Sequence, residues 1–184
     1  SRFALAKSGM ALNRLDTARI LLDQTYPHLL NTNISEAEWW LRSGRWWMKS
    51  EQLDSARIQL EQAQQLGNSE PNPRIEGFSL RFLGVLADYE GEQEQAIRLL
   101  LQGLNIFETI EDPEGMGMCH ISLGKVNESL KKYDPAVEAY QQALAHFSAA
   151  DLMDWQAIAL NNLGSVHLQM QAWEEAQEYV EQAL

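Results

Sequence analysis

The chain of 184 residues contains few of the residue types that interrupt helices. It has 5 prolines and 11 glycines, whereas Ala, Leu, Gln and Glu, which favour helices, are abundant. Because sustained alternation of Val, Ile and Thr is missing, we expect no β-sheet. Hydrophobic residues make up 45% and charged residues 22%, which is typical of a folded globular protein and not of a disordered one.

Cations are also scarce, since 14 Lys and Arg stand against 26 Asp and Glu, for a net charge of −12. Nucleic acids and anionic membranes attract proteins through Lys and Arg, so neither is an expected partner. No apolar run approaches the roughly 18 residues of a membrane-spanning helix. The single Cys119 cannot form an internal disulfide, which suits a reducing compartment and favours a cytoplasmic location.

What the chain does contain is a pattern that recurs five times. Alanines in similar contexts stand at Ala18, Ala56, Ala96, Ala136 and Ala176, at intervals of 38, 40, 40 and 40 residues. Twelve residues before them stand Ala6, Gly44, Gly84, Gly124 and Gly164. Small residues at both points, with large apolar residues between them, predict two helices per unit that cross closely. A fixed period near 40 of this kind is typical of a stacked helical solenoid.

Capping signals divide these units into ten helices. Ser35 and Glu38 form a capping box, and Asn72, Asp112 and Asp134 each precede a proline that suits the first helical position. We expect helices over residues 2–13, 16–26, 35–49, 52–66, 73–89, 92–110, 113–131, 134–149, 152–170 and 173–184. The corresponding units cover about 1–34, 35–72, 73–112, 113–152 and 153–184.

The pattern resembles that of the tetratricopeptide repeat (TPR) family, W-x2-L-G-x2-Y followed by A-x3-F-x2-A. One copy is visible at Trp40, Gly44, Trp47, Ala56, Leu60 and Ala63, and another at Leu123, Gly124, Ala136, Tyr140 and Ala143. The resemblance implies an all-α, right-handed superhelical solenoid of five TPR-like helix-turn-helix units. The usual unit has about 34 residues. Units of about 40 are similar to those of kinesin light chains and of bacterial peptide-sensing or maltose-responsive regulators.

Four of the six tryptophans lie close together in the second unit. We call the first helix of each unit the A helix and the second the B helix, and number each A helix so that its recurring glycine is position eight. Trp40 and Trp47 then face the B helix, while Trp39 and Trp46 lie on the flank toward the preceding unit. We favour this packing role over an aromatic ligand cage, and we assign Trp173 a packing role too.

Residues that could support catalysis or bind a metal are scattered. The four histidines are far apart in the sequence: His120, His146 and His167 lie on different predicted helices, and His28 follows the helix expected over residues 16–26. His120 and His167 replace core aromatics, so we expect hydrogen-bonded core histidines and not metal ligands. Cys119 is expected to be a buried thiol, and Gly115 and Gly117 do not follow a strand as a phosphate loop would. We therefore expect no catalytic residues, no metal site, no cofactor and no enzymatic activity.

One face of the A helices is a candidate binding surface. Positions two, five, nine, twelve and thirteen lie away from the B helix, and we call this surface the A face. The resemblance implies that it lines a concave groove that contacts peptides. The candidate residues are Lys7, Leu41, Arg45, Met48, Lys49, Phe78, Arg81, Tyr89, Met118, Ile121, Lys125 and Asn161. We expect carboxylates to bind Arg45, Lys49, Arg81 and Lys125, and apolar groups to bind Met48, Phe78, Tyr89 and Ile121.

These observations predict a protein–protein interaction module or scaffold whose partner is a protein or peptide with acidic and apolar groups. Two alternatives remain open. One is a sensor segment of a signalling ATPase or transcription regulator that binds a small metabolite or peptide. The other is a spacer or an array that associates end to end. Because the last predicted helix has the pattern of an inner helix, we also expect the sequence to be a fragment of a longer protein.

Overall fold

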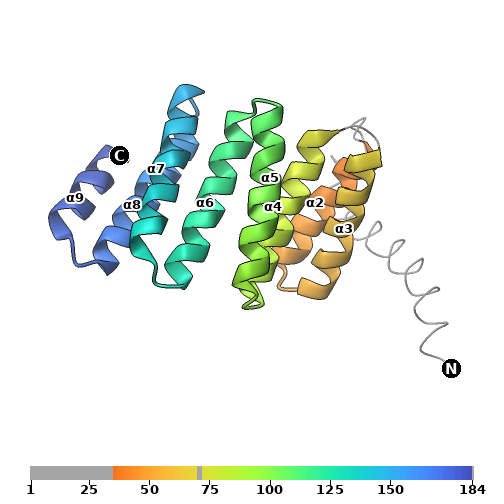
Figure 1. Cartoon of the computed structure of the whole chain (residues 1–184), viewed down its shortest axis with the longest axis horizontal. Coiled ribbons are helices and arrows are strands. Elements are labelled where there is room, and N and C mark those ends of the chain that lie inside the picture. The colour runs from red at the N-terminus through yellow and green to blue at the C-terminus, as the bar shows by residue number, and fades with distance from the viewer. Residues whose placement is uncertain (1–34, 70–71, 184) are drawn as a thin grey trace.

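The computed structural model describes residues 35–69 and 72–183, and all regular elements in these ranges are α-helices. They are α2 (Glu36–Lys49), α3 (Leu53–Ser69), α4 (Pro73–Tyr89), α5 (Gln93–Thr109), α6 (Pro113–Ser129), α7 (Tyr133–Ala149), α8 (Met153–Gln169) and α9 (Trp173–Gln182). Figure 1 shows the helix pairs following one another in chain order along the long axis of the structure. The predicted all-α solenoid is therefore confirmed. The expected first unit, residues 1–34 with Lys7, lies outside the described residues.

The helices follow one another with a period of 20 residues, half a unit. Six successive helices begin at Pro73, Gln93, Pro113, Tyr133, Met153 and Trp173. Apart from the connection between α3 and α4, each turn between described helices contains a residue with a positive φ: Glu51, Gly91, Glu111, Lys131, Asp151 and Gln171. In the Gly91 turn, the N–H groups of Gly91 and Glu92 donate to the carbonyls of Asp88 and Ala87 at 3.0 and 2.8 Å, which ends the helix. These regular turns place the helices within a few residues of the predicted bounds.

Three of the four predicted helix caps are confirmed. The Ser35, Asn72 and Asp112 side chains accept hydrogen bonds from backbone N–H groups three residues further on, at 3.2, 3.3 and 3.1 Å. The fourth is wrong, because α7 begins at Tyr133, and Asp134 lies within its first turn. The local capping chemistry thus fixes the start of α2, α4 and α6, the A helices of three successive units.

The two helices of a unit cross at the recurring glycine. A Cβ atom added to Gly124 would lie 2.6 Å from Cδ1 of Tyr140, and one added to Gly84 would lie 2.8 Å from Cγ of Leu100. Real Cβ atoms do not approach neighbours so closely, so the A and B backbones meet here without room for a side chain. The predicted close crossings are confirmed at Gly44, Gly84 and Gly124, the crossing at Gly164 is looser, and Ala6 lies outside the described residues.

Two further glycines let α6 pack against α5 of the preceding unit and against α7 of its own unit. Gly115 and Gly117 lie in the first turns of α6 and are buried. An added Cβ would overlap the ring of Phe107 at Gly115, and would lie 2.6 Å from Cζ of Phe147 at Gly117. Glycine at these two positions therefore leaves room for aromatic rings on α5 and α7. This packing role is in accordance with the expectation that the two glycines do not form a phosphate loop.

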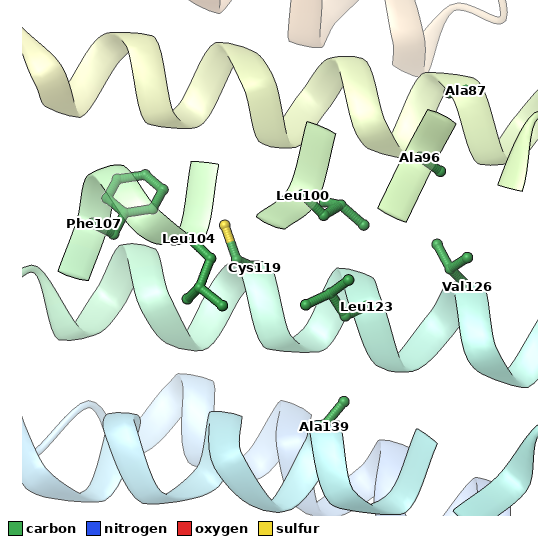
Figure 2. Packing of buried hydrophobic residues seen from close by; sticks show 9 residues of the cluster. All are labelled: Ala87, Ala96, Leu100, Leu104, Phe107, Cys119, Leu123, Val126 and Ala139. Carbon is green, nitrogen blue, oxygen red and sulfur yellow. The ribbon is translucent and has the colours of Figure 1, made fainter. Parts of the chain in front are cut away.

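The core continues from one unit to the next. Figure 2 shows one cluster to which α4, α5, α6 and α7 all contribute side chains. Cys119 on α6 turns its sulfur toward Leu104 and Leu100 of α5. Its thiol is fully buried, and loss of hydration raises the pKa of Cys119 to about 12. The predicted buried thiol is confirmed, and Cys119 is not a reactive group.

The tryptophans of α2 form two edge-to-face pairs. The ring centroids of Trp39 and Trp40 are 4.9 Å apart, and those of Trp46 and Trp47 are 4.7 Å apart. Trp40 is buried in the cluster shared by α2, α3 and α4, and the other three are half-buried. The core position of Trp40 is confirmed, and the rings pack on one another in the way that aromatic core pairs do.

The packing role predicted for Trp173 is wrong in this structure. Its side chain is 64% exposed, whereas Tyr133, at the equivalent position of α7, packs against the cluster that α7 and α8 share. The difference arises because α8 covers α7, while no described helix covers the outer side of α9.

None of the helices in residues 35–69 and 72–183 is both long and apolar enough to cross a membrane.

Candidate functional site

Three predicted binding residues belong to the core. Leu41, Met118 and Ile121 are 8%, 8% and 6% exposed and join the buried clusters. Neighbouring A helices contact one another directly, so positions two and five are partly closed by the next A helix. This contact between units removes them from the surface, and their assignment as freely accessible contacts for a ligand needs correction.

The other predicted residues in the described part of the chain remain at least partly accessible. Those that are exposed are Arg45, Lys49, Tyr89, Lys125 and Asn161, and those that are half-buried are Met48, Phe78 and Arg81. Phe78 packs against all three core clusters, and Met48 packs against the cluster shared by α2, α3 and α4. The A face therefore offers mainly cations, one exposed tyrosine and polar groups, with less apolar surface than the sequence predicts.

Arg45 and Arg81, from neighbouring A helices, meet at one aromatic ring. Their guanidinium carbons lie 5.1 and 4.8 Å from the ring centroid of Phe82. Both distances are within the range of cation–π attraction, which holds the two planar cations beside the same ring. The structure therefore brings together two cations that the sequence places 36 residues apart.

Arg81 is the more constrained of the two. Its Nε donates to the backbone oxygen of Met118 at 3.0 Å, which joins α4 to α6 and leaves its terminal nitrogens uncommitted. Burial lowers the pKa of Arg81 to about 10, and the charge of Arg45 acts in the same direction. The guanidinium is still protonated at neutral pH, so Arg81 is a partly dehydrated cation at the A face.

Carboxylates do not neutralise this pair. The ion pairs among residues 35–69 and 72–183 join Arg42 to Glu38, Arg57 to Glu90, and Arg74 to Asp112 and Glu114. Arg45, Lys49, Arg81 and Lys125 make none of these pairs. For an exposed cation the lack of a carboxylate partner costs little free energy, because water solvates the charge. For Arg81, which has lost much of its water, a bound anion would restore favourable interactions.

The acidic residues at the edge of the A face are engaged in structural hydrogen bonds. Ser129 Oγ donates to Asp88 at 3.2 Å, and Gln169 donates to Glu128, so each bond joins neighbouring A helices. Glu128 also accepts a hydrogen bond from the buried Tyr140 hydroxyl at 2.7 Å. Burial and this carboxylate together raise the pKa of Tyr140. These carboxylates fix the positions of the helices and are not partners of the A-face cations.

The histidines form stacked pairs. The rings of His120 and His146 are 5.4 Å apart and nearly parallel, and burial lowers the pKa of His120 to about 4. His167 stacks on Tyr179 at 5.2 Å, but both of its ring nitrogens are buried without a hydrogen-bond partner within the described ranges. The expectation of a hydrogen-bonded core histidine is wrong for His167.

In the part of the chain that the structure describes, no three His, Cys, Asp or Glu residues gather as metal ligands would.

Phe82 is the site residue that the sequence analysis missed. It occupies position six of its A helix, which lies on neither the core face nor the A face, and its contacts with Arg45 and Arg81 come from two different helices. A comparison of position nine in one unit with positions five and six in the next would have shown this combination of two arginines and an aromatic ring.

Comparisons with known proteins agree with this architecture. The family model described as Tetratricopeptide repeat matches residues 114–184. A curated relative, the Arabidopsis thaliana Protein KINESIN LIGHT CHAIN-RELATED 1, is 27% identical over 103 residues. That match includes 55% of this chain but 16% of the relative, so most of the relative has no counterpart here.

Solved structures share the fold at low sequence identity. BtubC (BKLC) from P. vanneervenii has a TM-score of 0.68 at 15% identity, covering 98% of this chain and 74% of its own. Aspartyl phosphate phosphatase F from Bacillus subtilis has a TM-score of 0.77 at 16% identity, covering 94% and 47%. The STAND protein with a tetratricopeptide repeat sensor from Pyrococcus horikoshii has a TM-score of 0.69 at 20% identity, covering 98% and 28%.

At these identities the structural likeness establishes the fold alone. The family match covers the helix pairs α6–α7 and α8–α9, and the two preceding described pairs repeat the glycine crossing at Gly44 and Gly84. The resemblance to TPR proteins with units of 40 residues is therefore confirmed, because residues 114–184 match the tetratricopeptide repeat model and the described chain forms an all-α solenoid of the same kind.

Proposed function

We propose that this chain is a non-enzymatic interaction module that binds a segment of a partner protein on its A face. The observation that carries the proposal is Arg81, a partly dehydrated cation without a carboxylate partner among the described residues. It lies beside Arg45 on the same ring, so one anionic group can interact with both guanidiniums.

Charge and exposure support an acidic partner. The whole chain carries a net charge of −12, yet the predicted binding residues include five cations, of which Lys7 lies outside the described residues, and no acid. An acidic segment is therefore repelled by most of the surface and attracted to the A face, which favours one mode of docking. Tyr89, which is 72% exposed, adds an aromatic contact of the kind enriched in interfaces.

Binding can be tested with an acidic, fluorescently labelled peptide titrated with the whole chain. Arg45→Gln should weaken binding by about tenfold, which corresponds to about 1.4 kcal/mol. Arg42→Gln is the matched control, because Arg42 is exposed on the same helix but paired with Glu38. Salt should also weaken binding of the unmodified chain. Equal losses in the two variants would show that overall charge, and not the A face, attracts the peptide.

A second candidate function is self-association through α9. Trp173 and Val180 are 64% and 43% exposed, although the residues equivalent to Val180 in the preceding B helices, Leu60, Leu100 and Tyr140, are fully buried. Apolar side chains of this size at a helix surface favour contact with a second copy. Light scattering over a concentration series should then show a rising mass that Trp173→Gln abolishes. A mass that stays constant over the series would contradict this candidate.

A further inference from the structure

The repeat places three equivalent pairs of residues along the A face. Arg45 stands at position nine of one A helix and Arg81 at position five of the next. The same register in the following units gives two more pairs. They are Val85 with Ile121, and Lys125 with Asn161. We call these pairs stations one, two and three, in chain order, and their chemistry differs in a regular way.

Station one is cationic. Arg45 is exposed and Arg81 is half-buried, and both lie against Phe82 at 5.1 and 4.8 Å. The hydrogen bond from Arg81 to the Met118 carbonyl fixes the orientation of its guanidinium. A planar group that accepts hydrogen bonds, such as a carboxylate, matches this arrangement.

Station two is apolar. Val85 is half-buried, Ile121 is buried, and Tyr89 is exposed one turn beyond Val85 on the same side of α4. The nearby Ser122 hydroxyl is already donated to the carbonyl of Met118 at 3.0 Å. Because Ile121 is buried, the surface that this station offers is that of Val85 and Tyr89, and an acidic group placed here would lose water without gaining a donor.

Station three offers hydrogen-bond donors again. Lys125 and Asn161 are exposed, and Lys125 has no carboxylate within ion-pair distance in residues 35–69 and 72–183. Asn162 stands where Phe82 stands at station one, and its amide nitrogen is buried without a hydrogen-bond partner among these residues. A cation and uncommitted amides at this register suit a second acidic or carbonyl-bearing group.

The distance between stations sets the spacing of a ligand. The A helices α4 and α6 touch, as the Arg81–Met118 and Ser129–Asp88 hydrogen bonds at 3.0 and 3.2 Å show, and a Gln169–Glu128 hydrogen bond joins α8 to α6. Helices in direct contact have axes about 8–10 Å apart. An extended chain advances about 3.3 Å per residue, so neighbouring stations are about three residues apart.

We infer that the A face selects extended peptides with an acidic residue, then an apolar residue, then a second acidic residue, at intervals of about three residues. This inference rests on the proposed function and adds the order of chemical groups that the partner presents. It predicts that two peptides of equal composition bind differently when the order of these groups differs.

The test compares two labelled peptides of about seven residues, a length that spans the three stations in extended form. Both are acetylated and amidated, so that only side chains carry charge. One has Glu, Leu and Glu at the predicted spacing, and the other has both Glu residues adjacent and Leu at the end. The ordered peptide should bind at least about tenfold more tightly to the whole chain. Equal, measurable affinities that Arg45→Gln reduces would overturn the inference and leave the proposed function standing. Binding of neither peptide would overturn both.

A reversal of charge locates the stations individually. Lys125→Glu should favour a peptide in which one terminal Glu is replaced by Lys over the ordered peptide with two Glu residues. Arg98→Glu, at an exposed position of the B helix α5, changes the net charge equally and should leave the preference unchanged. If both variants change the preference alike, the effect is one of overall charge, and the assignment of station three is wrong.

Discussion

The contact between Gly124 and Tyr140 allows a sharp test of the packing between the two helices of a unit. In Gly124→Ala, the new Cβ atom would lie 2.6 and 2.8 Å from two carbons of the Tyr140 ring. Tyr140 is fully buried, and its hydroxyl donates to Glu128 at 2.7 Å, so the ring cannot move aside without losing this bond. The strain must therefore separate α6 from α7 or distort both.

The size of the effect follows from two opposing contributions. Overpacking of a well-filled core costs about 1–3 kcal/mol. Alanine is a better helix former than glycine by about 1 kcal/mol, which offsets part of this cost. We expect Gly124→Ala to lower the free energy of unfolding by up to about 2 kcal/mol, or the midpoint temperature by up to about 8 °C.

Gly164→Ala is the matched control in the next unit. Its added Cβ would lie 3.1 Å from a methyl carbon of Val180, and this side chain is 43% exposed and can rotate away. The gain in helix propensity should then dominate, leaving stability unchanged or raised by up to about 1 kcal/mol. Thermal and urea unfolding followed by circular dichroism measure both variants. If Gly124→Ala is as stable as Gly164→Ala, the close crossing at Gly124 does not constrain the fold.

Three further predictions concern buried histidines and turns. His167→Phe removes buried nitrogens that have no partner among the described residues and keeps the stack on Tyr179. It should therefore raise the free energy of unfolding by about 1 kcal/mol or more. A lower free energy of unfolding, measured with urea, would contradict this. Burial lowers the pKa of His120 to about 4, so the unfolded chain binds a proton first and stability should fall as pH falls from about 6.5 to 4. His120→Leu, which copies Leu80 and Leu160 of the neighbouring units, should reduce that fall when unfolding is measured across this range, and an unchanged pH profile would refute it. Lys131→Gly, at a turn position with φ 57° where the preceding unit has Gly91, should stabilise the fold by up to about 1 kcal/mol in thermal unfolding, and a lower midpoint temperature would count against strain at this position.

The fold could be predicted because its determinants are local and repeated. The small residue at position eight and the alanine twelve residues later mark the crossing of two helices, and the structure places Gly84 and Gly124 at such crossings. The capping residues Ser35, Asn72 and Asp112 lie next to the helices they begin. Asp134 was misassigned because a proline at the second or third position of a helix satisfies the same rule as one at the first.

The site was less predictable because it depends on how units pack against each other. Helical periodicity places Leu41, Met118 and Ile121 away from the B helix, but it does not show that the next A helix covers them. Likewise, the contacts of Arg45 and Arg81 with Phe82 combine residues of two units. The exposure of Trp173 shows the same limit, because its position in the repeat predicts burial only where another helix covers it.

The contacts between A helices also affect how tightly the A face can bind a ligand. The Arg81–Met118, Asp88–Ser129 and Glu128–Gln169 hydrogen bonds each join one A helix to the next. With backbones held in this way, Arg81 keeps one orientation beside Phe82, and little side-chain freedom remains to be lost when a ligand binds. Affinity between proteins depends on such preorganisation more than on buried area. Two carboxylates of this negatively charged chain, Asp88 and Glu128, thus help to hold the A helices that carry the cations, which is the preorganisation that the proposed acidic partner would need.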